Sequence, residues 1–67
     1  MKRLKLKNEI FSLKSINMAK EAYAKLASIA IIQGRRNTEL IFTNCRYGED
    51  RTVKEFENYL IGLENSQ

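Results

Sequence analysis

The sequence predicts a small α+β domain with the element order β-α-β-β-α, in which a three-stranded sheet carries two helices on one face. Three observations lead to this fold class. Residues 3–7 alternate basic and apolar side chains, which is the period of a half-buried strand. Residues 16–26 and 53–63 repeat apolar side chains at steps of three or four, as amphipathic helices do. Residues 29–32 and 39–45 flank a short polar turn, as in a β-hairpin.

The chain is short and has the composition of an ordered protein. It has 67 residues, of which 43% are hydrophobic and 30% charged, and it contains no proline. Disordered chains are poor in apolar residues, so residues 1–67 are predicted to form one domain with a single thin core. Such a core leaves few side chains with which to wall off an active site, and the length therefore disfavours an enzyme.

The first predicted strand, residues 3–7, directs leucines to the core and basic side chains to water. The alternation breaks at residues 8–9, which predicts a bend or bulge. Ser12 or Ser15 then caps a helix, because a serine oxygen accepts hydrogen bonds from the first-turn N–H groups. The apolar stripe of this helix consists of Ile16, Ala19, Tyr23 and Leu26.

The second strand is predicted at residues 29–32, a β-branched run that is too short for a helix. Gly34 and Asn37 suit a tight turn, after which residues 39–45 form the third strand. A strand-helix-strand unit normally leaves its two strands parallel, so the third strand is expected between them and antiparallel to both. Residues 3–7 and 29–32 then lie at the two edges of the sheet.

The last helix follows a polar loop at residues 46–51. Thr52 and Glu55 have the spacing of a capping box, in which each side chain accepts a hydrogen bond from the other residue's backbone N–H. The adjacent acids Glu49 and Asp50 precede this helix, where the helix dipole favours negative charge. The helix presents one apolar stripe, made up of Val53, Phe56, Leu60 and Leu63.

The residue types needed for most catalysis are missing. The sequence has no histidine, which removes the commonest general base and most zinc sites, and its three glycines lack phosphate-loop spacing. No catalytic residue, metal site or cofactor is therefore predicted. Cys45, the single cysteine, is interpreted as a small half-buried hydrophobic residue, with a reactive thiol as the alternative. The lack of disulfide pairs and of a membrane-length apolar run predicts a cytoplasmic protein.

The basic residues suggest one possible binding surface. The net charge of +4 is uneven, since residues 1–46 carry ten basic and three acidic side chains. The candidate basic patch is Lys5, Lys7, Arg35 and Arg36. For the turn pair, solubilising charge and a role in holding phosphate backbones are equal alternatives. A small basic nucleic-acid-binding protein is therefore the alternative function, disfavoured because no aromatic residues lie between the cations.

The two predicted sheet edges differ in charge. Lysines protect residues 3–7, whereas residues 29–32 carry no charge. An unprotected apolar edge invites an extended peptide or a second copy of the chain to add a strand. The predicted partner-binding residues are Ile29, Ala30, Ile31 and Ile32. A peptide or protein partner is expected, a homodimer remains open, and no membrane partner is expected.

Four segments, spread over almost the whole chain, follow the pattern of a known family. They are Phe11-Ser12 before Ile16, the helix with Ala19, Ala22 and Tyr23, the strand at residues 29–32, and Glu55-Phe56-Glu57-Asn58-Tyr59-Leu60. These segments resemble the HxsD family of the His-Xaa-Ser peptide-maturation system. The resemblance implies an accessory protein that acts beside radical-SAM enzymes and binds a ribosomally made precursor peptide or the enzyme. It implies no catalytic residue.

Overall fold

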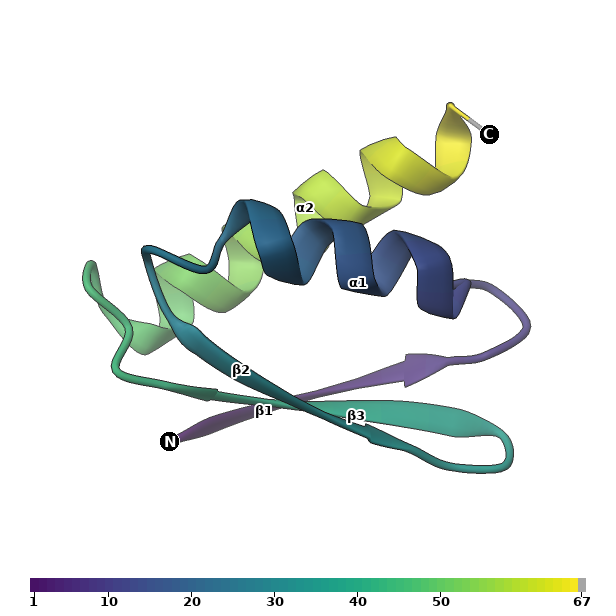
Figure 1. The fold of residues 1–67 in the computed structure, drawn as a ribbon, viewed down its shortest axis with the longest axis horizontal. Helices are drawn as coiled ribbons and strands as arrows, with labels where there is room; N and C mark the ends of the chain where they lie inside the picture. Colours follow the sequence, from purple (N-terminus) through teal and green to yellow (C-terminus); the bar gives the residue numbers. More distant parts are fainter. Residues whose placement is uncertain (67) are drawn as a thin grey trace.

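The computed structural model describes residues 1–66, so the last residue of the predicted 1–67 domain lies outside them. The elements follow the predicted order: β1 (Lys2–Lys7), α1 (Leu13–Ala22), β2 (Ser28–Gln33), β3 (Asn37–Thr43) and α2 (Glu49–Asn65). β3 is the central strand and pairs antiparallel with both neighbours, giving the order β1-β3-β2. Both helices lie on one face of this sheet (Figure 1), which confirms the predicted α+β fold class. Neither helix within residues 1–66 is long and apolar enough to cross a bilayer.

The sheet separates a helix-covered face from an open face because successive side chains of a strand alternate. On β3, Thr38, Leu40 and Phe42 are buried, while the residues between them are partly exposed. The strand register places Leu6 opposite Thr38 and Ile29 opposite Phe42, so the buried side chains of all three strands share the helix-covered face.

Three aromatic rings join the helices to the sheet. Phe56 of α2 is fully buried and meets Phe42 of β3 edge to face, with ring centroids 5.2 Å apart. The Phe56 ring also meets Tyr23 edge to face, with ring centroids 5.4 Å apart. Edge-to-face pairs of this kind add stability beyond the area that they bury. The remaining buried apolar side chains are Leu6, Ile16, Ala19, Ala27, Ile29, Leu40, Val53 and Leu60.

The start of α1 is capped by residues from both helices. Ser12 is the N-cap, and its Oγ accepts a hydrogen bond from the Ser15 N–H at 3.2 Å. Glu64, near the end of α2, accepts hydrogen bonds from the Ser12 N–H at 2.9 Å and from the Ser12 hydroxyl at 3.0 Å. The Ser12 N–H, helped by the Ser15 and Ser12 hydroxyls, holds the pKa of Glu64 below its ordinary value. This tertiary cap ties the end of α2 to the start of α1.

The Glu64 cap predicts a pH-dependent stability. A carboxylate with a lowered folded-state pKa contributes stability that is present above its unfolded pKa and lost as pH falls through the folded pKa. We therefore expect the wild-type melting temperature to fall more steeply than that of Glu64→Gln as pH drops below about 4.5. Thermal melts followed by circular dichroism from neutral to acidic pH measure this. Glu57→Gln, on the same helix, is the matched control, and a pH profile of Glu64→Gln equal to that of the wild type would contradict the role of the cap.

Several predicted boundaries shift. α1 ends at Ala22, and a turn follows where the helix was expected to continue to Leu26. β3 ends at Thr43, so Cys45 lies just beyond the strand. The predicted bend after β1 is a turn in which the N–H groups of Ile10 and Phe11 both donate to the Lys7 carbonyl. This turn brings Phe11 against the core, while Ile10 stays 55% exposed.

The predicted capping box of the last helix is wrong. α2 begins at Glu49, and its N-cap is Gly48, whose φ of 95° lies in the left-handed region that favours glycine. Thr52 is therefore a buried residue of the first turn, and Glu55 pairs instead with Arg51 at 2.9 Å. Among residues 1–66 no side chain caps the N-terminus of this helix, whose first turn carries Glu49 and Asp50.

Candidate functional site

The four predicted edge residues divide between the two faces of the sheet. Ala30 and Ile32 lie on the open face and are exposed, with Ile32 at 52%. Ile29 is buried beneath the helices, and Ile31 is half-buried on the same side. An approaching strand would therefore meet the side chains of Ala30 and Ile32 on the open face, while Ile29 is committed to the core.

Hydrogen bonds at the hairpin turn determine which backbone groups of β2 face outward. The Gly34 N–H donates to the Asn37 carbonyl at 2.8 Å, so these two residues form a hydrogen-bonded pair. Such pairs alternate with non-hydrogen-bonded pairs along an antiparallel ladder. The even-numbered residues of β2 therefore bond to β3, whereas the N–H and C=O groups of the odd-numbered residues point to the free edge. These outward-facing residues are Ile29, Ile31 and Gln33. Sequence reasoning missed Gln33 because it is polar.

The same alternation shows that the β1 edge is protected. The Asn8 N–H donates to the Arg36 carbonyl at 2.9 Å, which directs the backbone groups of the odd-numbered β1 residues outward. Those residues are Arg3, Lys5 and Lys7, and all three are exposed cations. Arg3 also pairs across the open face with Glu39 at 2.9 Å. An added strand would meet a row of positive charges at β1 and none at β2.

Asn8 holds the hairpin turn against the end of β1. Its side-chain amide donates to the carbonyls of Gly34 at 3.0 Å and Arg35 at 3.3 Å, and its oxygen accepts from the Thr38 hydroxyl at 2.7 Å. Gly34 is required here, since a Cβ at this position would lie 2.7 Å from the Asn37 carbonyl oxygen. These contacts determine where the turn presents its arginines.

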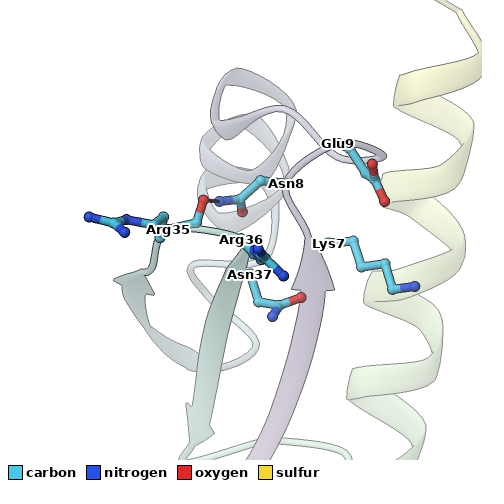
Figure 2. Close-up of a pocket in the computed structure, with 6 residues that line it drawn as sticks. All are labelled: Lys7, Asn8, Glu9, Arg35, Arg36 and Asn37. Carbon is cyan, nitrogen blue, oxygen red and sulfur yellow. Dashed lines mark hydrogen bonds between the residues drawn. The ribbon is translucent and has the colours of Figure 1, made fainter.

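The structure brings three of the four predicted basic-patch residues together. Lys7, Arg35 and Arg36 line an open depression at the hairpin turn, together with Asn8, Glu9 and Asn37 (Figure 2). Lys5 lies outside this lining, two residues back along β1 on the same open face. Figure 2 shows the Arg35 side chain extending away from Lys7, so the cations do not converge on one point.

No aromatic ring lines the depression. Tyr47, the exposed loop aromatic, follows the far end of β3, so the length of that strand separates it from the hairpin turn. Bases of single-stranded nucleic acids usually stack on such rings. The depression therefore offers charge without a stacking platform.

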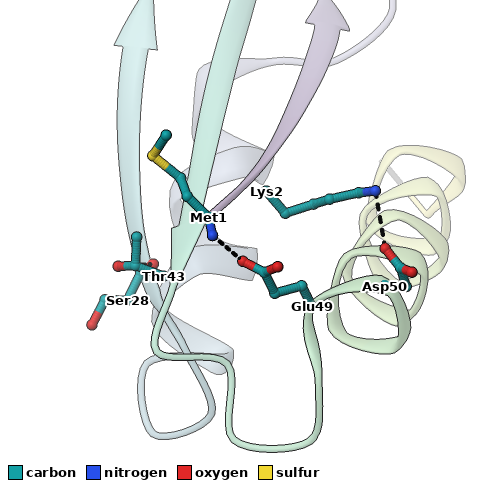
Figure 3. Close-up of polar contacts among 6 residues, drawn as sticks. All are labelled: Met1, Lys2, Ser28, Thr43, Glu49 and Asp50. Atoms are coloured by element: carbon teal, nitrogen blue, oxygen red, sulfur yellow. Dashed lines mark hydrogen bonds and ion pairs between the residues drawn. The ribbon is translucent and has the colours of Figure 1, made fainter.

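The acids at the start of α2 are used within the fold (Figure 3). The Glu49 carboxylate forms an ion pair with the amino group of Met1, and Asp50 pairs with the Lys2 ammonium at 2.9 Å. The hydrogen bond to Asp50 and the charge of that carboxylate raise the pKa of Lys2. Together with their place in the first turn, these contacts give the acidic pair a structural role.

Cys45 is half-buried and packs against the core, as expected for a small hydrophobic side chain. Within residues 1–66, no three side chains of histidine, cysteine, aspartate or glutamate gather in a way that would hold a metal ion. Among residues 1–66, the free edge of β2 is the feature best suited to binding a partner.

The fold and the edge define a class, a small α+β domain with one uncharged sheet edge, but they do not define a family. No family model matches the chain, and neither a curated protein nor a solved structure was found to match it. The resemblance to the HxsD family stays a prediction.

Proposed function

We propose that the protein is a non-catalytic, cytoplasmic accessory module that binds an extended segment of a peptide or protein by adding it as a fourth strand beside β2. The observation that carries this proposal is the free edge, where Ile29, Ile31 and Gln33 direct backbone donors and acceptors outward without a charged side chain on the strand. Ala30 and Ile32 supply apolar contacts on the open face. Main-chain pairing would provide affinity, and these side chains would provide selectivity.

The resemblance to the HxsD family supports a more specific partner. In that family's setting, the bound segment is a ribosomally made precursor peptide or part of its radical-SAM maturase. The chain would then present or position the peptide while the partner enzyme performs the chemistry. This division of labour agrees with a sequence that contains no histidine and only one cysteine.

Binding of nucleic acid is the second candidate function, and the depression lined by Lys7, Arg35 and Arg36 favours it. Binding of phosphate backbones releases counterions, so its affinity falls steeply with salt. The affinity of β2 for an uncharged added strand would change little over the same range of salt concentration. Titrating a single-stranded oligonucleotide and an uncharged strand-forming peptide at low and high salt therefore separates the two functions.

Strand addition is tested most simply on the ligand. We choose an alternating valine and threonine peptide of about nine residues, long enough to cover β2. Two versions are N-methylated at alternate amides, in opposite phases. In an added strand only one phase directs its N–H groups to β2, so that version should lose at least about tenfold in affinity through its missing hydrogen bonds. The other version, the matched control, should bind nearly as well as the parent peptide, and equal losses in both phases would contradict strand addition.

A further inference from the structure

The free edge of β2 is uncharged along its length but has cations at both ends. Arg35 and Arg36 follow the strand at the hairpin turn. Lys25 precedes its other end, and Arg46 is brought to that end because its N–H donates to the Leu26 carbonyl at 2.8 Å. All four cationic side chains are exposed.

These four flanking cations are not neutralised within the fold. The ion pairs among residues 1–66 use the amino group of Met1 and the side chains of Lys2, Arg3 and Arg51. None of them involves a flanking cation. The charges at the ends of β2 are thus available to a ligand. By contrast, the amino group of Met1 and the side chain of Lys2, at the start of β1, already pair with acids of α2.

A second copy of the chain is a poor occupant of this edge. Two β2 strands pairing antiparallel about a two-fold axis place the start of one strand beside the end of the other. Lys25 and Arg46 of one copy would then lie near the hairpin-turn arginines of the other, and this would occur twice. Like charges brought together across an interface disfavour that pairing.

We infer that the occupant is an extended peptide with an uncharged, apolar centre and acidic residues at both ends. This inference rests on the proposed function and specifies its ligand. The centre spans about six residues, the length of β2, and the acids fall where the flanking cations lie. The apolar centre meets Ala30 and Ile32, and the acidic ends complement the two cationic ends.

The flanking charges are exposed, so their effect depends on salt. Exposed charges are screened within about 10 Å at 0.1 M salt and act mainly on the rate of association. At low salt the acidic ends should therefore speed binding and tighten it. At moderate salt the backbone pairing should dominate, and removing two flanking cations should change affinity little.

The test uses three peptides that share a Val-Thr-Val-Thr-Val-Thr centre, as long as β2, and carry paired glutamate, glutamine or lysine residues at both ends. At about 20 mM salt the glutamate peptide should bind about tenfold tighter than the glutamine peptide, and the lysine peptide should bind weakest. Arg35→Ala with Arg36→Ala, and separately Lys25→Ala with Arg46→Ala, should each remove about half of that advantage on a logarithmic scale. The matched control, Lys20→Ala with Lys54→Ala, removes the same charge from the helices. It should keep most of the affinity advantage of the glutamate peptide over the glutamine peptide.

Equal affinity for the glutamate and glutamine peptides at low salt would overturn the acidic-end inference and leave strand addition intact. Binding of none of the three would overturn both. The oligomeric state of the chain without peptide is measured by analytical ultracentrifugation. A stable dimer that Ala30→Lys dissociates would identify a second copy as the occupant and contradict the inference.

Discussion

Phe56→Ala is expected to lower the free energy of unfolding by about 3 kcal/mol or more, because removing a buried aromatic ring leaves a large cavity. Phe56 is fully buried and its ring stands between Phe42 of the sheet and Tyr23 beyond α1. The loss therefore affects both layers of the domain. A chain of this size has only a few kcal/mol of net stability, so much of the variant should be unfolded at ambient temperature.

Urea and thermal melts of the variant measure this effect. Tyr59→Ala is the matched control, since Tyr59 lies on the same helix, contacts Tyr23 at 5.7 Å between ring centroids and is 43% exposed. Tyr59→Ala should lower the free energy of unfolding clearly less than Phe56→Ala does. A Phe56→Ala melt within a degree or two of the wild type would show that the ring is not part of the core.

Ala30→Lys is expected to weaken binding of an uncharged strand-forming peptide at least about tenfold while leaving the fold intact. Ala30 is exposed on the open face, so the lysine side chain can reach solvent. Its backbone groups bond to β3, which makes it a non-hydrogen-bonded position toward an added strand, and opposing side chains approach most closely at such positions. A charge there would face an apolar residue of the ligand.

Two variants control for charge. Ala22→Lys adds the same charge to an exposed position on α1 and should bind like the wild type. Arg35→Ala with Arg36→Ala should leave peptide binding nearly unchanged at moderate salt, because exposed ion pairs contribute only about 0–1 kcal/mol. If the double arginine variant lost binding while a folded Ala30→Lys kept it, strand addition would be wrong and the basic patch would be the binding site.

The element order and strand order were predictable because local pattern and chain connectivity agree. The leucine and lysine alternation of residues 3–7 sets the faces of β1, and a strand-helix-strand connection leaves β3 to pair between the outer strands. The start of α2 was not predictable from the same kind of pattern. Thr52 and Glu55 have capping-box spacing, but the helix begins at Glu49, after the left-handed Gly48. Local spacing does not reveal that backbone conformation.

The candidate site was predictable as a run of residues but not as a surface. Residues 29–32 stand out because they are apolar and uncharged. Their division between two faces, and the outward backbone groups of Gln33, depend on a register set by the Gly34 and Asn37 pair. Of the two cations at the far end, Lys25 is close to β2 in sequence, whereas Arg46 is far from it and is placed by one backbone hydrogen bond to Leu26.

Amide hydrogen exchange with and without a saturating strand-forming peptide tests strand addition at β2 most directly. Added pairing protects amides that point to the free edge and changes little at amides that already bond to β3. Strand addition predicts new protection at Ile29, Ile31 and Gln33, with little change at Ala30 and Ile32. New protection along the odd-numbered residues of β1, or binding without new protection at either edge, would contradict it.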